Sequence, residues 1–162
     1  MALDTEVQRA IDRIMIGELI QIYGSHYDEG RMDEFDRLFT DDAVLDFSPD
    51  PGYFPVPLIG KAMISEHMGA RNAEVAAVAQ RRHLTTNTIF EHIDDDTART
   101  ESFLTVLSVA HGSNQPIVNA TGMYRDVFRK VDGRWLFAER RATLDAVVSR
   151  KEPDPAAETG TD

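Results

Sequence analysis

Near the start of the chain, apolar residues recur at steps of three and four, the spacing of one face of an α-helix. The pattern predicts a long helix over residues 5–29. Its expected buried face comprises Val7, Ile11, Ile14, Met15, Leu19, Ile22 and Tyr23, widened by Ile16 and Ile20. Asp4 or Thr5 is suited to cap its start, and Gly30 stands where helices commonly end. A short second helix is predicted over residues 31–39, with Met32, Phe35, Leu38 and Phe39 turned inward.

The middle of the chain is less regular. Residues 43–47 are typical of a short strand, and five Pro and Gly residues between positions 49 and 57 then interrupt regular structure. This loop is suited to form the rim or lid of a pocket. A helix is expected over residues 61–70, and residues 72–80 form an alanine-rich connection whose structure the pattern leaves open.

Beyond position 80 the period changes to that of long strands, predicted at 81–93, 97–111, 116–131 and 134–148. Turn residues separate them, and Asp132-Gly133 is the strongest hairpin signal. Helices followed by an antiparallel meander indicate the α+β class, with a cone-shaped curved sheet wrapped around the long first helix. We expect one domain over residues 1–149 and a disordered acidic tail over 150–162, since the tail lacks large apolar residues.

The composition excludes several classes of function. With 162 residues the chain is the size of one domain, and its net charge of −11 argues against nucleic acid or an anionic membrane as a partner. The absence of cysteine excludes disulfides, thiolate metal sites and a Cys nucleophile. The acidic N-terminus does not resemble a signal peptide, and no run of residues is apolar enough to span a membrane. We therefore expect a cytoplasmic protein.

Five segments in this order resemble the SnoaL-like branch of the nuclear transport factor-like superfamily, whose members include scytalone dehydratase, bile acid dehydratase, a dehydrochlorinase and ketosteroid isomerase. The resemblance covers roughly residues 5–146. Its carriers are Tyr23-Gly-Ser-His-Tyr-Asp28, Phe35-Asp-Arg-Leu-Phe-Thr-Asp-Asp-Ala43, Arg82-His83 with Asn87, Gly122-Met-Tyr124-Arg-Asp126-Val-Phe128, and Asp132-Gly-Arg-Trp135 continuing to Arg140-Arg141. It implies the cone fold, and members are commonly dimers or trimers, so it also implies a homo-oligomer.

In the similar dehydratases and the dehydrochlorinase, the positions of Asp28 and His83 hold a catalytic acid-base pair. The chemistry suits these residue types, because an imidazole accepts a proton at neutral pH and a carboxylate on its other nitrogen orients it and stabilises the imidazolium. Spacing alone also allows a plainer interpretation, with Asp28 as a helix cap and His83 as an ordinary core residue.

Two tyrosines are candidates beside this pair. Tyr23 matches the tyrosine that acts on the departing hydroxyl in the bile acid enzyme, whereas Tyr27 resembles the tyrosine of the scytalone enzyme. Tyr23 and Asp28 lie about 140° apart on an ideal helix, so they share a pocket only if the helix bends or the cavity is wide. We rank Tyr23 first as catalytic and Tyr27 as substrate-binding, with core packing as the alternative for both.

The two-residue period of strands supplies the remaining candidates for substrate binding. Asn87 is expected on the face of His83, and Ser108 on the inner face that also carries Ser102, Leu104 and Val106. Tyr124 is expected inward with Gly122. Asp126, Arg140 and Arg141 are suited to a buried ion pair, and we choose Arg141 to face a ligand because it shares an alternating face with Phe137. Packing roles remain open for Tyr124 and Arg141.

The sequence departs from its relatives at two positions. The second pocket histidine of the scytalone enzyme aligns best with Ser108, and the second aspartate of the bile acid enzyme falls near Val106. The substrate is therefore expected to differ. An apolar lining that includes Phe54, Leu58, Met63, Leu104 and Val106 suggests a small hydrophobic ring compound.

The scattered histidines form no metal-ligand motif, and no nucleotide-binding or serine-hydrolase motif is present, so we expect neither a metal nor a cofactor. The leading hypothesis is a cofactor-independent lyase, of the dehydratase type, or an isomerase that uses Asp28, His83 and Tyr23. The alternatives are a non-catalytic binding protein of the same fold and a purely structural role.

Overall fold

The computed structural model describes residues 2–147. In chain order its elements are α1 (Ala2–Asp28), α2 (Met32–Asp36), β1 (Phe39–Ser48), β2 (Leu58–Ile59), α3 (Lys61–Ala76), β3 (Ala79–Ile93), β4 (Thr97–Ala110), β5 (Ile117–Val131) and β6 (Arg134–Val147). The four long predicted strands begin and end within two residues of the observed ones. The strand expected over 43–47 begins four residues earlier, at Phe39, so the helix expected over 31–39 is shorter than predicted. The helix expected over 61–70 is longer, because α3 continues through the alanine-rich connection to Ala76. The tail expected over 150–162 lies outside the described residues.

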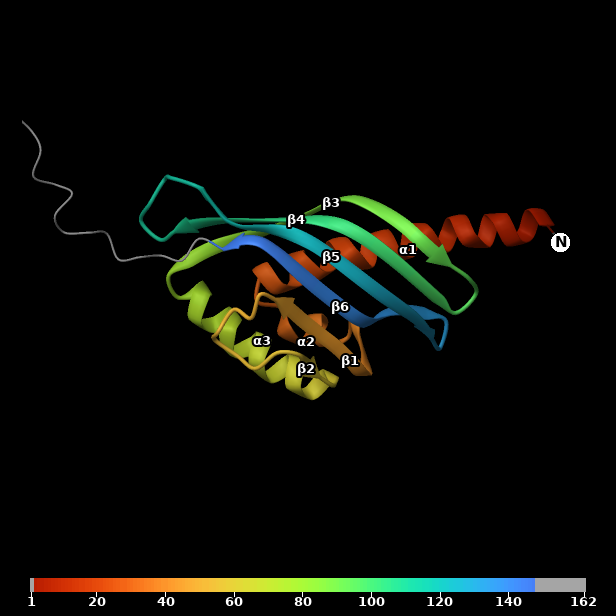
Figure 1. The fold of residues 1–162 in the computed structure, drawn as a ribbon, viewed down its shortest axis with the longest axis horizontal. Coiled ribbons are helices and arrows are strands. Elements are labelled where there is room, and N and C mark those ends of the chain that lie inside the picture. The colour runs from red at the N-terminus through yellow and green to blue at the C-terminus, as the bar shows by residue number, and fades with distance from the viewer. Residues whose placement is uncertain (1, 148–162) are drawn as a thin grey trace, which may run out of the picture.

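The strands form one curved sheet in the order β2-β1-β6-β5-β4-β3. The β3–β6 meander is antiparallel, whereas β1 pairs with β6 in parallel. Figure 1 shows α1 running along one face of this sheet, with α2 and α3 on the same side next to β1. This is the expected α+β cone, in which the helices and the concave face of the sheet enclose the core.

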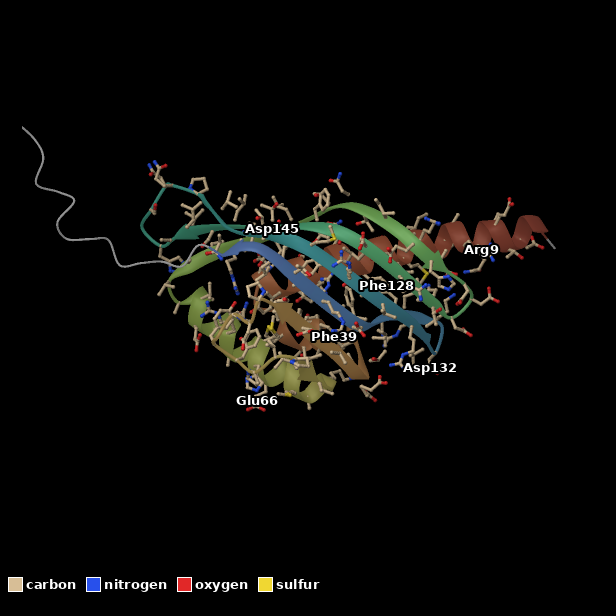
Figure 2. All side chains as sticks on the ribbon, in the orientation of Figure 1. Arg9, Phe39, Glu66, Phe128, Asp132 and Asp145 are labelled. Atoms are coloured by element: carbon tan, nitrogen blue, oxygen red, sulfur yellow. The ribbon has the colours of Figure 1, made fainter. Side chains whose placement is uncertain are left out.

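The core lies between the sheet and the helices. Phe39 of β1 and Phe128 of β5 are 1% and 0% exposed, and Figure 2 shows both labels within the body of the molecule, whereas Glu66 and Asp132 lie at its periphery. Tyr23, Phe35 and Phe137 join them in a cluster of edge and tilted ring contacts. Aromatic side chains from two helices and three strands thereby fill the core between the helices and the sheet.

The buried face of α1 differs from the expected one. The helix buries Ile16, Leu19, Ile20, Tyr23 and Tyr27 against the sheet, whereas Val7, Ile11, Ile14, Met15 and Ile22 are at least one third exposed. Two apolar stripes run along this helix, and the sheet covers only one of them. The first turns of α1 also project past the end of the sheet, as Figure 1 shows. The predicted burial is therefore correct for Leu19, Tyr23, Ile16 and Ile20 and wrong for the other residues of the expected face.

Residues without a cross-strand partner interrupt the long strands and increase their curvature. On β3, Thr86 pairs with Phe103 and Ile89 with Glu101, so one extra residue lies between them, and Asn87 there has a φ of 56°. On β6, Phe137 pairs with Phe128 and Glu139 with Val127, which leaves Ala138 unpaired. Each of these β-bulges exchanges the inward and outward faces of the strand beyond it.

Candidate active site

Asp28 and His83 lie in direct contact, with both carboxylate oxygens engaged. The Nδ1 atom of His83 is 2.6 Å from Oδ1 of Asp28, and the backbone N–H of His83 donates to Oδ2, also at 2.6 Å. The side chain of His83 is 10% exposed, and that of Asp28 is 4% exposed. Two bonds from one carboxylate orient the imidazole and place the proton on Nδ1, so Nε2 is the nitrogen that is free to accept a proton.

The C-terminal turn of α1 positions Asp28. The N–H of Gly30 donates to the carbonyl of Tyr27, and that of Arg31 donates to His26, in the double-bonded helix ending that a glycine at φ +67° permits. Two side-chain amides add to this ending, because Asn72 of α3 also donates to the carbonyl of Tyr27 at 2.5 Å and Gln80 of β3 donates to the carbonyl of Asp28 at 3.2 Å. The helix end that carries Asp28 is thus fixed from three sides.

His83 opens onto a cavity beside α1. The cavity has a volume of about 70 Å³, whereas a single water needs about 10–15 Å³ on the same measure, so it has room for a small ligand. Its lining comprises Tyr23, Tyr27, Phe47, Tyr53, Phe54, Met68, Arg71, Arg81, His83, Leu104, Val106, Asn119, Ala120, Tyr124 and Leu144. The surface is mostly apolar and aromatic, with His83 and two arginines as its ionisable groups other than tyrosine. Such a lining suits an apolar ligand with a few polar groups.

Three buried tyrosines face this cavity. Burial raises the pKa of Tyr23 well above its usual value, and Tyr124 raises it further while Arg140 opposes the shift. Burial likewise raises the pKa of Tyr124 and that of Tyr27, where Arg81 opposes it. All three hydroxyls therefore keep their protons at neutral pH and are available as hydrogen-bond donors.

Arg140 and Asp126 form the expected buried ion pair beneath these tyrosines. Nε and Nη2 of Arg140 each donate to one oxygen of Asp126 at 2.8 Å, and both side chains are fully buried. The guanidinium carbon also lies 4.1 Å from the ring centroid of Tyr23 and 4.0 Å from that of Tyr124. Burial raises the pKa of Asp126, although the charge of Arg140 opposes this shift. The pair thus supports the two pocket tyrosines from behind.

Most predicted site residues converge on the cavity. Tyr23, Tyr27, His83 and Tyr124 line it, and Asp28 lies behind His83. Ser108 is buried on the inner face of β4, as expected, but it does not reach the lining. Of the expected apolar lining, Phe54, Leu104 and Val106 are present, whereas Leu58 and Met63 pack in the core instead.

Two residues that were predicted to bind substrate, Asn87 and Arg141, face away from the cavity. The β-bulges explain both orientations. Asn87 is exposed because the extra residue in β3 at that point ends the alternation that begins at His83. Arg141 is exposed and pairs with Glu139 and Asp46, because the unpaired Ala138 shifts the alternation by one and turns Arg140 inward. Both expectations of a pocket position were therefore wrong.

Arg71, Arg81 and Asn119 also line the cavity, although the sequence pattern did not predict them there. Arg81 had a usable signal, since it stands two residues before His83 and so shares its strand face. Within residues 2–147, no three His, Asp or Glu side chains gather in a way that would hold a metal ion. In the same range, no helix combines the length and the apolar character that a membrane span needs.

The fold and cavity define a small α+β protein with a largely apolar pocket beside an Asp-His pair. Residues 8–141 match the family model of the SnoaL-like domain, and the chain belongs to this family. No curated protein sequence matches the chain.

Solved structures share the fold. A nuclear transport factor-like protein with a cystatin-like fold from Novosphingobium aromaticivorans has a TM-score of 0.77 and 21% identity, with 90% of each chain covered. A candidate scytalone dehydratase from the same organism has a TM-score of 0.72 and 18% identity, with 89% of each chain covered. A protein from Catenulispora acidiphila in complex with S-DNPA has a TM-score of 0.69 and 26% identity, covering 84% of this chain and 95% of the other.

Proposed function

We propose that the protein is a cofactor-independent lyase of the dehydratase type, or an isomerase, that acts on a small hydrophobic ring compound through Asp28 and His83. The observation that carries the proposal is the imidazole of His83 at the cavity wall, with Nδ1 held 2.6 Å from the Asp28 carboxylate. Family membership supports it, because the SnoaL-like resemblance includes cofactor-independent dehydratases. The homo-oligomer that this resemblance implies stays a prediction.

In an elimination, Nε2 of His83 removes a proton from the carbon next to an activating carbonyl. The electrons of the C–H bond form the new C=C bond while the bond from the neighbouring carbon to its hydroxyl breaks. The imidazolium returns its proton to the departing hydroxide, which leaves as water, so His83 ends the cycle neutral. Asp28 stabilises the imidazolium between these two transfers.

Tyr23 and Tyr124 are suited to bind the carbonyl oxygen of the substrate. Their raised pKa values make them reluctant to lose a proton, so we assign them hydrogen-bond donation rather than proton transfer. A donor on this oxygen stabilises the negative charge that develops as His83 removes the proton. An isomerase would use the same two groups and return the proton to another carbon.

Substitution of His83 by Ala tests the proposal. We expect wild-type protein to convert a fused-ring β-hydroxy ketone to the corresponding phenol, or to exchange its acidic C–H for deuterium, and His83→Ala to lower either rate by about 10²-fold or more. Ultraviolet absorption follows the phenol, and NMR in D₂O follows the exchange.

The matched control is His92→Ala on the same strand, because His92 also contacts an aspartate, Asp94, but both side chains are more than one third exposed. It should keep the wild-type rate. Equal rates for wild type and His83→Ala would refute the assignment. Tight binding of such ketones with no chemical change in any variant would instead favour a binding protein.

A further inference from the structure

Two arginines at the cavity have no part in the proton transfer. Arg81 of β3 and Arg71 of α3 both belong to the lining, and they come from separate elements. The chain as a whole carries a net charge of −11, so a cationic lining is a local exception. Positive charge at a cavity of an acidic protein favours an anionic group on the ligand.

The guanidinium groups are stacked on tyrosine rings. The guanidinium carbon of Arg81 lies 4.8 Å from the ring centroid of Tyr27, and that of Arg71 lies 4.1 Å from the centroid of Tyr53. Arg81 also forms a side-chain hydrogen bond with Tyr27, and Arg71 uses Nη1 for Glu74, so the remaining N–H groups of each are available for a planar, two-oxygen anion. This is the arrangement that binds a carboxylate.

Neither arginine is neutralised by a buried carboxylate. Arg71 bonds through Nη1 to Glu74, whose side chain is 66% exposed, and its Nε is buried without a partner. Within the part of the chain that the structure describes, Arg81 forms no ion pair, whereas the next residue, Arg82, pairs with Glu29 at 3.1 Å. Asp28, behind His83, uses both of its oxygens for His83. The lining therefore has hydrogen-bond donors and positive charge that remain available to a ligand.

We infer that the cavity binds a ring compound with a carboxylate, which contacts Arg81 and Arg71, while its apolar body lies against Leu104 and Val106. This inference rests on the proposed function, because it names the ligand class of the same cavity. Arg81 and His83 are two residues apart on one strand face, or about 7 Å along the strand. The carboxylate would thus lie about one ring away from the carbon that His83 deprotonates, and Tyr27 contacts both side chains.

Calorimetry with naphthoate and its neutral analogue naphthamide tests the inference. The two probes share one apolar body, and we expect the wild-type protein to bind naphthoate at least about tenfold more tightly. Arg81→Gln should remove most of this preference and leave the affinity for naphthamide within about twofold. Arg71→Gln provides a second variant on another element and should reduce the preference as well. Arg82→Gln, adjacent on the strand but exposed, should keep it.

Equal binding of the two probes by wild-type protein, or a preference that survives both Arg81→Gln and Arg71→Gln, would overturn the inference. Repeating the measurement in His83→Ala separates it from the proposed function. If turnover depends on His83 but the preference does not depend on either arginine, only the inference fails. If the wild-type protein shows the arginine-dependent preference but no turnover, the inference stands and the proposed activity fails.

Discussion

Arg140 and Asp126 form an ion pair with no exposure to solvent, and its surroundings decide how much it contributes. The two bonds satisfy both oxygens of Asp126, but Nη1 of Arg140 is buried without a partner. Burial of two charges costs several kcal/mol for each ion, and mutual attraction offsets this cost only when the geometry is good. The pair therefore depends on both members, because either one alone is a buried charge without compensation.

Substitution of Arg140 by Met should destabilise the fold by about 3–5 kcal/mol, because it leaves Asp126 buried and unpaired. The double variant with Asp126→Leu should recover much of this loss, since it removes both charges. Denaturant unfolding measures both effects. The control is Arg141→Met, on the exposed side of the same strand, where the loss should stay below about 1 kcal/mol. A double variant as unstable as Arg140→Met would show that the charge is not the cause.

At the scale of elements, the close approach of α1 to β3 brings Asp28 to His83. A Cβ atom at Gly24 would lie 2.9 Å from Cβ of His83 and 3.4 Å from its backbone oxygen. Real Cβ atoms almost never approach this closely, so a side chain at position 24 would push the helix away from the strand. Gly24 thus permits the helix to lie where the Asp28 carboxylate reaches both the backbone N–H and Nδ1 of His83.

Gly24→Ala should cost about 1–3 kcal/mol of stability and weaken the contact between Asp28 and His83. Chemical denaturation reports the first effect, and the NMR signal of the proton on Nδ1 of His83 reports the second. Gly17→Ala is the matched control on the same helix, because a Cβ atom there has no neighbour within 4 Å. It should be neutral or stabilise by about 0.5–1 kcal/mol. An unchanged His83 signal in Gly24→Ala would contradict the positioning role.

At the scale of the whole molecule, Asp12 joins the long helix to the far end of the sheet. Its Oδ1 accepts from Nε1 of Trp135 at 2.9 Å, and its Oδ2 accepts from Nζ of Lys130 at 3.0 Å. Burial raises the pKa of Asp12, but the hydrogen bonds from Lys130, Trp135 and Gln8 outweigh this and lower it below its usual value. The folded state therefore stabilises the charged carboxylate.

A lowered pKa means that this stabilisation is complete above the unfolded pKa of about 3.9 and is lost as pH falls through the folded value. We expect Asp12→Asn to be less stable than wild type by about 1–3 kcal/mol at neutral pH. The difference should stay constant down to about pH 5 and shrink below about pH 4. Thermal or denaturant unfolding across this range measures it, with the exposed Asp95→Asn as control. A difference that grows on acidification would contradict the sign.

The sequence by itself determined the order of the main elements, although not the short strand β2 or the start of β1. Strand periodicity and the Asp132-Gly133 turn located the four long strands to within two residues, and Gly30 marked the end of α1, since these signals depend on local backbone preferences. The family motif identified Asp28 and His83 as a candidate pair. In the structure, Nδ1 of His83 lies 2.6 Å from Oδ1 of Asp28. Their catalytic role stays a prediction.

Only the tertiary structure decided which side of an element faces the cavity. α1 carries two apolar stripes, and the position of the sheet, not the helix period, selects the one that is buried. A single unpaired residue in β3 and another in β6 turned Asn87 and Arg141 outward and Arg140 inward. A β-bulge arises from the pairing of two strands and exchanges the faces of every residue beyond it, so alternation along one strand cannot reveal it.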